Sequence, residues 1–467
     1  MKILYFVLSD NGRDIDMVMP LRYFLEEVLG HTFNVSYVFD WHQINRQKPD
    51  VIMLPNTIGA PIYFELSKFA YESGIPVFAL DSEGHFRTDN IYNFWGHNKD
   101  KFYYQDYFCA WSNRTRDYLK VETRQADQIV TTGGLGFDVY SIYKCKSKAE
   151  YLKEHNLDYK YVVGYAAWAF GKVTSEKGRR DLISYFKGDE TQLSKMEPQR
   201  FAIESMLRHA IENNPDTLFI LKVHPLERKE LFEEPPLNEI SNLLGYENVI
   251  FEDENSKISD LMNVSDLWLS FESTTAIEAW ALNKLTVLLQ NDPDFSSSIA
   301  EKKMDVSQPI ARNSEEVQAY IDEVKKTGAL VAFDNPDREI KRGEVIGESV
   351  GFSDGYNHLR VVYFFMKTLE RRKTITPKYR FLLKYYIRYI LILIGVKFHK
   401  NKLFLKLPKV KKFLFIFKHY HFKDLHALYE SRKPQFAEFY KKNRIVERFK
   451  SGELFDEIIQ PEDKKST

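Results

Sequence analysis

The chain has 467 residues, of which 44% are hydrophobic and 28% are charged, with 21 Gly and 17 Pro. This composition excludes collagen-like, low-complexity and wholly disordered proteins, and the length predicts two or three domains with large cores. Cys109 and Cys145 are too few for a disulfide scaffold or a four-thiolate zinc site, and they indicate a reducing compartment.

The net charge of zero conceals an uneven distribution. Of the 66 basic residues, 16 lie between residues 371 and 423, where there is no Asp or Glu. The rest of the chain therefore carries 50 basic and 66 acidic residues, a balance of −16. We expect no secretory signal, and no segment reaches the ~18–20 apolar residues of a membrane-spanning helix. The best candidate, 385–396, is short and contains Arg388.

Residues 1–140 alternate short apolar runs with helical patterns, which is typical of a parallel sheet covered by helices on both faces. Strands are expected at 2–8, 34–39, 50–54, 76–80, 107–110 and 128–131, and helices at 19–29 and 63–73. A glycine-rich turn at 131–136 lacks the spacing and the position of a dinucleotide-binding loop.

A polar, Lys-rich stretch at 141–160 is expected to be a linker, and the alternation then begins again. Strands are expected at 161–165, 217–223, 248–251, 266–270 and 285–289, and helices at 199–213, 257–263, 275–282, 314–326 and 358–370. The predicted fold is α/β, with two Rossmann-like domains, 1–150 and 151–370, facing across a cleft. A basic helical extension, 371–467, follows. Ligands in such sheets bind at the carboxyl ends of the strands.

The first candidate motif is Lys222-Val223-His224-Pro225, which follows an apolar strand. A histidine at a strand's carboxyl end can donate a hydrogen bond to a phosphate and stabilise the charge of a leaving group. The alternative is a structural histidine in a loop.

The second motif, at 270–279, follows another strand and opens a helix. Ser273, Thr274 and Thr275 offer hydroxyl and backbone N–H groups to a phosphate. Thr275 and Glu278 also have the spacing of a capping box, so a well-capped helix is the alternative.

The third motif is Asp81-Ser82-Glu83-Gly84, after the strand at 76–80. A carboxylate at a strand end can act as general base toward an acceptor hydroxyl. A simple Asp/Ser turn is the alternative. Spacing does not decide between Asp81 and Glu83, and we favour Glu83.

The sequence predicts no metal site. The two cysteines lie far apart, the 12 histidines include no H-E-x-x-H pair, and 292–294 is a lone acidic pair. A P-loop and a nucleophile elbow are also absent from the sequence.

The order of these motifs resembles the two-domain GT-B glycosyltransferases of bacterial surface polysaccharide synthesis, over roughly residues 1–370. The chain is most similar to inverting enzymes that use CMP-activated sialic-acid-type or Kdo sugars in capsule and lipopolysaccharide synthesis. The motifs that carry the resemblance are Glu83-Gly84, residues 133–138, His224-Pro225, and Ser273-Thr274-Thr275 with Glu278.

The resemblance implies a metal-independent transfer onto a glycan or lipid-linked glycan acceptor. It implies Glu83, or Asp81, as the base and His224 on the nucleotide phosphate. The nucleotide site would comprise Ser273, Thr274, Thr275, Glu278, Lys222 and Pro225, with Glu278 on the ribose. The chain departs from the family at Ser82, where a second carboxylate is common.

Three other functions remain open. The His-Pro and Ser-Thr motifs also resemble CDP-polyol phosphotransferases of teichoic-acid synthesis. A non-catalytic nucleotide-sugar-binding scaffold and a sugar-nucleotide 2-epimerase are the others.

The basic segment mixes cations with aromatic and aliphatic residues. Arg380, Lys384 and Arg388 recur every four residues, and apolar side chains lie mostly elsewhere on the same helix. This pattern favours an anionic membrane surface contacted through residues 378–418, and so a peripheral location on the cytoplasmic face of the bacterial membrane. Docking on the acidic body is an alternative, and nucleic-acid binding is the least favoured partner.

Overall fold

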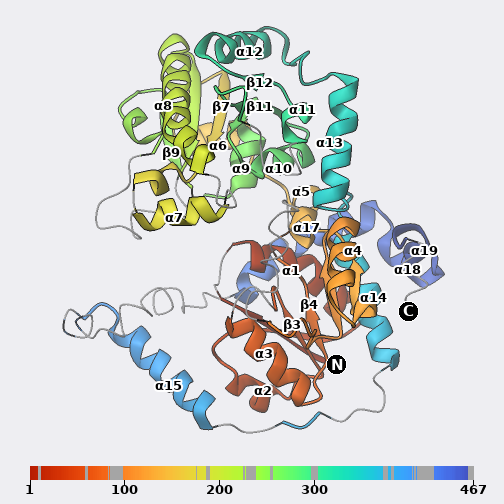
Figure 1. The fold of residues 1–467 in the computed structure, drawn as a ribbon. Helices are drawn as coiled ribbons and strands as arrows, with labels where there is room; N and C mark the ends of the chain where they lie inside the picture. Colours follow the sequence, from red (N-terminus) through yellow and green to blue (C-terminus); the bar gives the residue numbers. More distant parts are fainter. Residues whose placement is uncertain are drawn as a thin grey trace. The chain divides into compact units, whose positions relative to one another are not determined.

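The computed structural model describes residues 1–8, 12–57, 61–82, 84, 98–174, 176–185, 190–224, 227, 238–252, 256–295, 303–371, 377–379, 383–401, 403, 406 and 425–460. The chain forms two compact units (Figure 1): Met1–Tyr143 with Gly347–Thr467, here unit 1, and Lys144–Ile346, here unit 2. Each unit contains one six-stranded parallel sheet, with helices on its faces.

The sheet of unit 1 has the strand order β2-β1-β3-β4-β5-β6. Its strands are β1 Lys2–Val7, β2 Thr32–Tyr37, β3 Val51–Leu54, β4 Val77–Ala79, β5 Tyr107–Ala110 and β6 Ile129–Thr131. Its helices are α1 Arg13–Tyr23, α2 His42–Gln47, α3 Pro61–Glu72, α4 Asn113–Glu122, α5 Asp138–Ile142, α14 Asn357–Arg371, α15 Leu383–Phe398, α17 Leu425–Lys442, α18 Ile445–Ser451 and α19 Glu453–Ile458. Every strand predicted in this half is confirmed. The helix expected at 19–29 instead begins at Arg13 and continues as a π-helical turn, Phe24–Val28.

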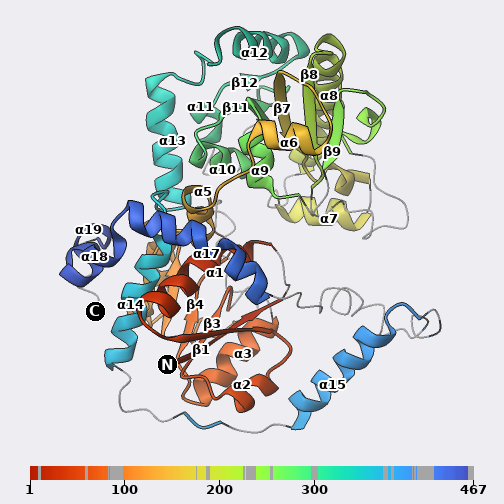
Figure 2. The ribbon, with the colours of Figure 1, turned by 180° about the vertical axis from the view of Figure 1, so that it is seen from behind.

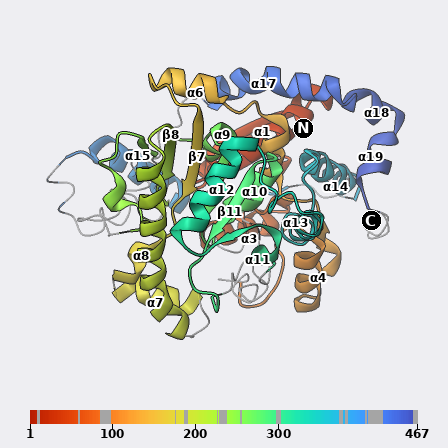
Figure 3. The ribbon, with the colours of Figure 1, turned by 90° about the horizontal axis from the view of Figure 1, so that it is seen from above.

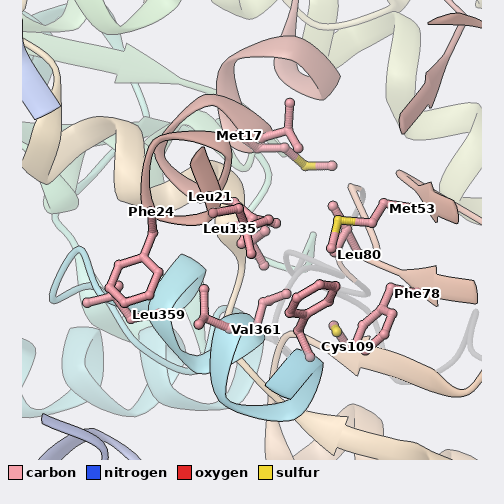
Figure 4. Close-up of a cluster of buried hydrophobic side chains, with 14 of the residues drawn as sticks. Met17, Leu21, Phe24, Met53, Phe78, Leu80, Cys109, Leu135, Leu359 and Val361 are labelled. Atoms are coloured by element: carbon pink, nitrogen blue, oxygen red, sulfur yellow. The ribbon is translucent and has the colours of Figure 1, made fainter. Parts of the chain in front are cut away.

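Side chains of β1 alternate between two cores because successive residues of a strand point to opposite faces of the sheet. Ile3, Tyr5 and Val7 pack under α1, α14 and α17 (Figure 4 shows part of this cluster). Leu4 and Phe6 pack on the other face, with residues of α2 and α3. The strands are apolar throughout because both faces of a parallel sheet are buried.

The C-terminal region differs from the predicted boundaries. Residues 347–370 were expected in the second domain, and 371–467 as a separate extension, but both belong to unit 1. Helix α17 lies along α1 (Figure 2), and its Tyr429, Phe436 and Tyr440 are buried in the core of unit 1. The physical reason is hydrophobic, since these aromatic side chains fall on one face of α17 and cover α1.

A buried polar network joins α5, α14 and α17. The imidazole Nδ1 of His358 lies 2.8 Å from Asp138 Oδ2, and its Nε2 lies 2.8 Å from the hydroxyl of Tyr440. Asp138 also accepts backbone N–H bonds from Asn357 and His358. The glycine-rich stretch 133–138 thus ends in a contact that holds the C-terminal helices on unit 1.

The sheet of unit 2 has the order β12-β11-β10-β7-β8-β9. Its strands are β7 Tyr161–Ala166, β8 Thr217–Lys222, β9 Val249–Glu252, β10 Leu267–Ser270, β11 Leu285–Leu289 and β12 Ile310–Ala311. Its helices are α6 Lys148–Glu154, α7 Glu176–Tyr185, α8 Glu190–Asn213, α9 Ile258–Val264, α10 Thr275–Ala281, α11 Met304–Ser307, α12 Ser314–Thr327 and α13 Pro336–Ser349, whose last residues belong to unit 1. Helices α8 and α12 pack side by side (Figure 3).

The predicted strands of the second half are confirmed, whereas β12, α7, α11 and α13 were not predicted. The expected linker at 141–160 is also partly helical. It contains the end of α5 and the whole of α6, which begins with a capping box formed by Ser147 and Glu150. That local signal was present in the sequence.

Candidate functional site

The first and second motifs follow two strands of the unit 2 sheet that end at the same edge of that sheet. Strand β7 lies between β8 and β10, and Ala166 is in register with both Lys222 and Ser270. The chain therefore leaves all three strands at the same level, with His224 beyond β8 and Ser273 beyond β10. Neighbouring strands are ~4.8 Å apart, so β8 and β10 are separated by about 10 Å.

His224 is half-buried, and its backbone carbonyl accepts a hydrogen bond from Glu227 N at 2.9 Å. Backbone pairing continues one residue past β8, because Val223 N donates to Glu252 O at 3.1 Å. Lys222 is buried in the last position of the strand. Pro225 lies outside the described residues.

The three hydroxyl residues at 273–275 are half-buried. Ser273 Oγ and Thr275 Oγ1 lie 3.0 Å apart, and Trp268 Nε1 donates to Thr275 Oγ1 at 3.1 Å. The helix N-cap is Thr274 and has no side-chain cap bond, so the capping box considered for Thr275 and Glu278 does not form.

Two glutamates, Glu278 and Glu272, lie close in sequence to these hydroxyl residues. Glu278 is buried in the first turn of α10. Glu272 has a φ of 42°, a left-handed conformation that costs a non-glycine residue about 1–2 kcal/mol. Strain of this kind is concentrated at functional sites.

A buried carboxyl pair, missed by the sequence analysis, supports the same edge. Glu239 Oε1 accepts hydrogen bonds from Tyr165 OH at 2.8 Å and from Trp168 N at 2.7 Å. Glu227 accepts from Gly171 N and from Asn238 Nδ2. Both carboxyls therefore hold the loop that follows β7, between the His224 and Ser273 motifs. Glu227 stands three residues after His224 in the sequence, whereas nothing in the sequence singles out Glu239.

Aromatic side chains fill the space beside this loop. Phe170 stacks on Phe271 with ring centroids 5.2 Å apart, and Trp168 meets both rings edge-on. These contacts make the loop after β7 a packed element that joins the ends of β7 and β10.

Burial raises the pKa of Glu227 to about 7 and that of Glu239 to about 8, the latter also through repulsion by Glu227. The native state thus holds protons that the unfolded chain releases near pH 4.5, the ordinary carboxyl pKa. We therefore expect the stability of unit 2 to fall as the pH rises from about 5 through 8. The slope is ~1.4 kcal/mol per pH unit for each proton.

Thermal unfolding at pH 5.5, 7 and 8.5 measures this dependence. Glu227→Gln with Glu239→Gln should flatten it, and the exposed Glu72→Gln in α3 should leave it unchanged. A wild-type melting temperature that is constant over this range would contradict the raised pKa values.

The third motif lies at the carboxyl end of β4 in unit 1. Asp81 is 2% exposed and has a φ of 49°, and its carbonyl accepts a hydrogen bond from Trp111 Nε1. Ser82 N donates to Pro55 O at 2.7 Å. Glu83 lies outside the described residues. Gly84 abuts Trp111 so closely that an added Cβ would lie 2.1 Å from the ring, so this position requires glycine.

No group of three or more His, Cys, Asp or Glu side chains in the part of the chain that the structure describes could hold a metal ion. Cys109 and Cys145 are both free thiols, and Cys109 is buried in the core of unit 1.

The fold of this chain is similar to that of several solved structures. Neither a protein-family model nor a curated protein sequence matches the chain. A structure from Listeria monocytogenes, assigned as a UDP-N-acetylglucosamine 2-epimerase, is 14% identical with a TM-score of 0.50, over 82% of this chain and 99% of that one. The complex of S. aureus MnaA with UDP is 14% identical with a TM-score of 0.51, over 81% of this chain and 100% of that one. The chain therefore has a GT-B-like α/β fold, as the sequence predicted.

Proposed function

We propose that this protein is a GT-B glycosyltransferase that transfers a sugar from a pyrimidine nucleotide onto a glycan or lipid-linked glycan acceptor. The observation that carries the proposal is the register of β8, β7 and β10, which brings His224 and the Ser273–Thr275 hydroxyls to one sheet edge. Donors placed there can stabilise the negative charge that develops on a departing nucleotide.

The reaction we propose is an inverting displacement. The acceptor hydroxyl attacks the anomeric carbon, a carboxylate takes the hydroxyl proton, and the bond from the sugar to the phosphate oxygen breaks. Glu83, which the sequence motif favours, is the proposed base, and Asp81, which is almost wholly buried, is the alternative. His224, Ser273 and Thr275 hydrogen-bond the leaving phosphate, and Glu278 binds the ribose. The proposed reaction needs no divalent cation.

The nucleotide is proposed as a pyrimidine on two grounds. The sequence motifs resemble enzymes that take CMP-activated nonulosonic acids or Kdo. A protein with a similar fold was crystallised with UDP. Both nucleotides carry a ribose and a phosphate at the same positions, so the same side chains can serve either.

A thermal-shift panel of CMP, CDP, UDP, GDP and ADP, with and without Mg²⁺, tests this proposal. A ligand at 100 times its dissociation constant stabilises the native state by ~2.7 kcal/mol, a shift of several degrees. We expect CMP or UDP to stabilise the protein without Mg²⁺ and the purine nucleotides to have no effect. A response to CDP alone would indicate a polyol phosphotransferase. Stabilisation by purines only, or by none of the five, would overturn the proposed donor.

A UDP-sugar 2-epimerase is the second candidate, supported by the assignment of the Listeria monocytogenes structure. An epimerase acts on its nucleotide sugar without any glycan. Incubation of the protein with UDP-N-acetylglucosamine alone, followed by NMR, distinguishes the two candidates. Conversion to the 2-epimer would favour the epimerase, and an unchanged donor that turns over only with a glycan acceptor would favour the transferase.

A further inference from the structure

Helix α15, Leu383–Phe398, presents apolar side chains on two opposite sides. One side packs on unit 1: Tyr385 contacts Trp41 with ring centroids 4.3 Å apart, Tyr389 contacts His42 at 4.0 Å, and Ile392 is buried. The helix lies against α2 at the margin of unit 1 (Figures 1 and 2). The segment before it is also fixed, because Lys378 N donates to Ser73 O and Tyr379 OH donates to Pro49 O, both at 2.8 Å.

The opposite side of α15, here the outward face, is exposed and apolar. At 100° per residue its six members fall within an arc of about 100°. The members of this face are Leu383, Ile387, Ile390, Leu391, Ile394 and Phe398. Each of these six side chains is 40–60% exposed. A row of this kind differs from the scattered exposed apolar residues of an ordinary protein surface, and it marks an interaction site.

The charged side chains beside the outward face indicate what kind of surface it contacts. Lys384 and Lys397 are exposed at the two edges of the outward face, near opposite ends of the helix, and Lys400 is exposed just beyond it. Residues 371–423 contain 16 basic and no acidic residues. Lysine is depleted at protein interfaces but favoured beside anionic lipid, where its long stem lets the ammonium reach the headgroups.

The length of α15 limits how the helix can contact a bilayer. Sixteen residues make a helix of about 24 Å, shorter than the ~30 Å hydrocarbon layer of a bilayer. Among the described helices none is long and apolar enough to span a membrane. Because its inner side is held by unit 1, α15 can present only its outward face to a bilayer, which is the geometry of a helix that lies in the plane of the interface.

The arrangement of the cations differs from the stripe expected from the sequence. The guanidinium of Arg388 lies 4.5 Å from the centre of the Phe39 ring, so it packs on unit 1 and belongs to the inner side. Arg380 lies outside the described residues. The lipid contact is thus assigned to the outward face with its flanking lysines.

We propose that the outward face of α15 inserts into the interface of an anionic bilayer, with unit 1 as its rigid support. The test is flotation of the full-length protein with vesicles of phosphatidylcholine, with or without 30% phosphatidylglycerol. The variant Ile387→Glu/Leu391→Glu/Ile394→Glu should reduce the partition coefficient on anionic vesicles at least tenfold. Val121→Glu, at an exposed apolar position of α4, is the control and should bind like the wild type.

The charge contribution is tested separately. Lys384→Glu/Lys397→Glu should abolish the preference for anionic vesicles, and binding of the wild type should weaken as salt rises. Circular dichroism verifies that each variant is folded. Wild-type vesicle binding by the triple Glu variant would overturn the proposal. A second result would also overturn it: a wild-type protein that binds no vesicles and is a dimer in analytical ultracentrifugation, together with a triple Glu variant that is a monomer. Nucleotide-induced stabilisation should be unaffected by these variants, so the lipid contact and the proposed function fail independently.

Discussion

His224→Ala should lower the turnover number of sugar transfer by about 10²–10³, the effect of removing one donor that stabilises developing negative charge. The histidine follows β8 directly and is half-buried, so its loss should leave the fold intact. The stabilisation by CMP or UDP should also shrink, since the same imidazole is proposed to contact the phosphate of the bound nucleotide. Initial rates at saturating donor, with thermal shifts for the same protein, measure both effects.

His426→Ala is the matched control, because that side chain is largely exposed at the start of α17. It should have wild-type rates. Wild-type turnover by the His224 variant would remove the histidine from the proposed mechanism and leave a structural loop residue.

Glu83→Gln should separate chemistry from binding. The amide cannot accept the acceptor's proton, so transfer should be lost, while nucleotide stabilisation should persist because unit 2 is unchanged. If Asp81→Asn abolishes transfer and Glu83→Gln does not, the base is Asp81 and not Glu83.

Gly351→Ala should destabilise unit 1 by about 2–5 kcal/mol, the sum of a left-handed backbone and a steric clash. Gly351 has a φ of +86°, and an added Cβ would lie 2.1 Å from the carbonyl oxygen of Trp111. The backbone at Trp111 cannot retreat easily, because its ring is packed against Gly84 and Gly134. The melting temperature should fall by roughly 5–15 °C.

Two other glycines separate the effect of a left-handed backbone from the effect of a steric clash. Gly328 also has a positive φ, 71°, but its Cβ would meet no atom within 4 Å, so Gly328→Ala should cost only ~1 kcal/mol. Gly343 lies within α13 with open space around it, and Gly343→Ala should stabilise by ~0.5–1 kcal/mol. Equal melting temperatures for the Gly351 and Gly328 variants would refute the clash with Trp111.

Most of the fold was predictable from local patterns. A parallel strand is buried on both faces, so runs such as Val51–Leu54 and Leu218–Leu221 are continuously apolar and easy to recognise. Strand β12 was missed because two residues, Ile310–Ala311, carry too little pattern. Helix α13 was missed because its polar residues outnumber its apolar ones.

The motifs of the candidate site were predictable from the sequence, whereas their arrangement around β7 was not. His224 and Ser273 are recognisable because each follows an apolar strand, but they are 49 positions apart in the sequence, and only the strand order brings their strands to either side of β7. Glu239 has no local signal at all. Its role comes from accepting the N–H of Trp168, 71 residues away.

By itself the sequence determined the two α/β units, their strands, and the motifs that follow β4, β8 and β10, because apolar periodicity and strand-end residues are local properties. Only the tertiary structure decided where the C-terminal region belongs. Aromatic residues of α17 pack into unit 1, and α15 buries Tyr385 and Tyr389 while it exposes Ile387 and Leu391. A helix that is apolar on two sides can bury either one, and the choice depends on the surface that the rest of the chain offers.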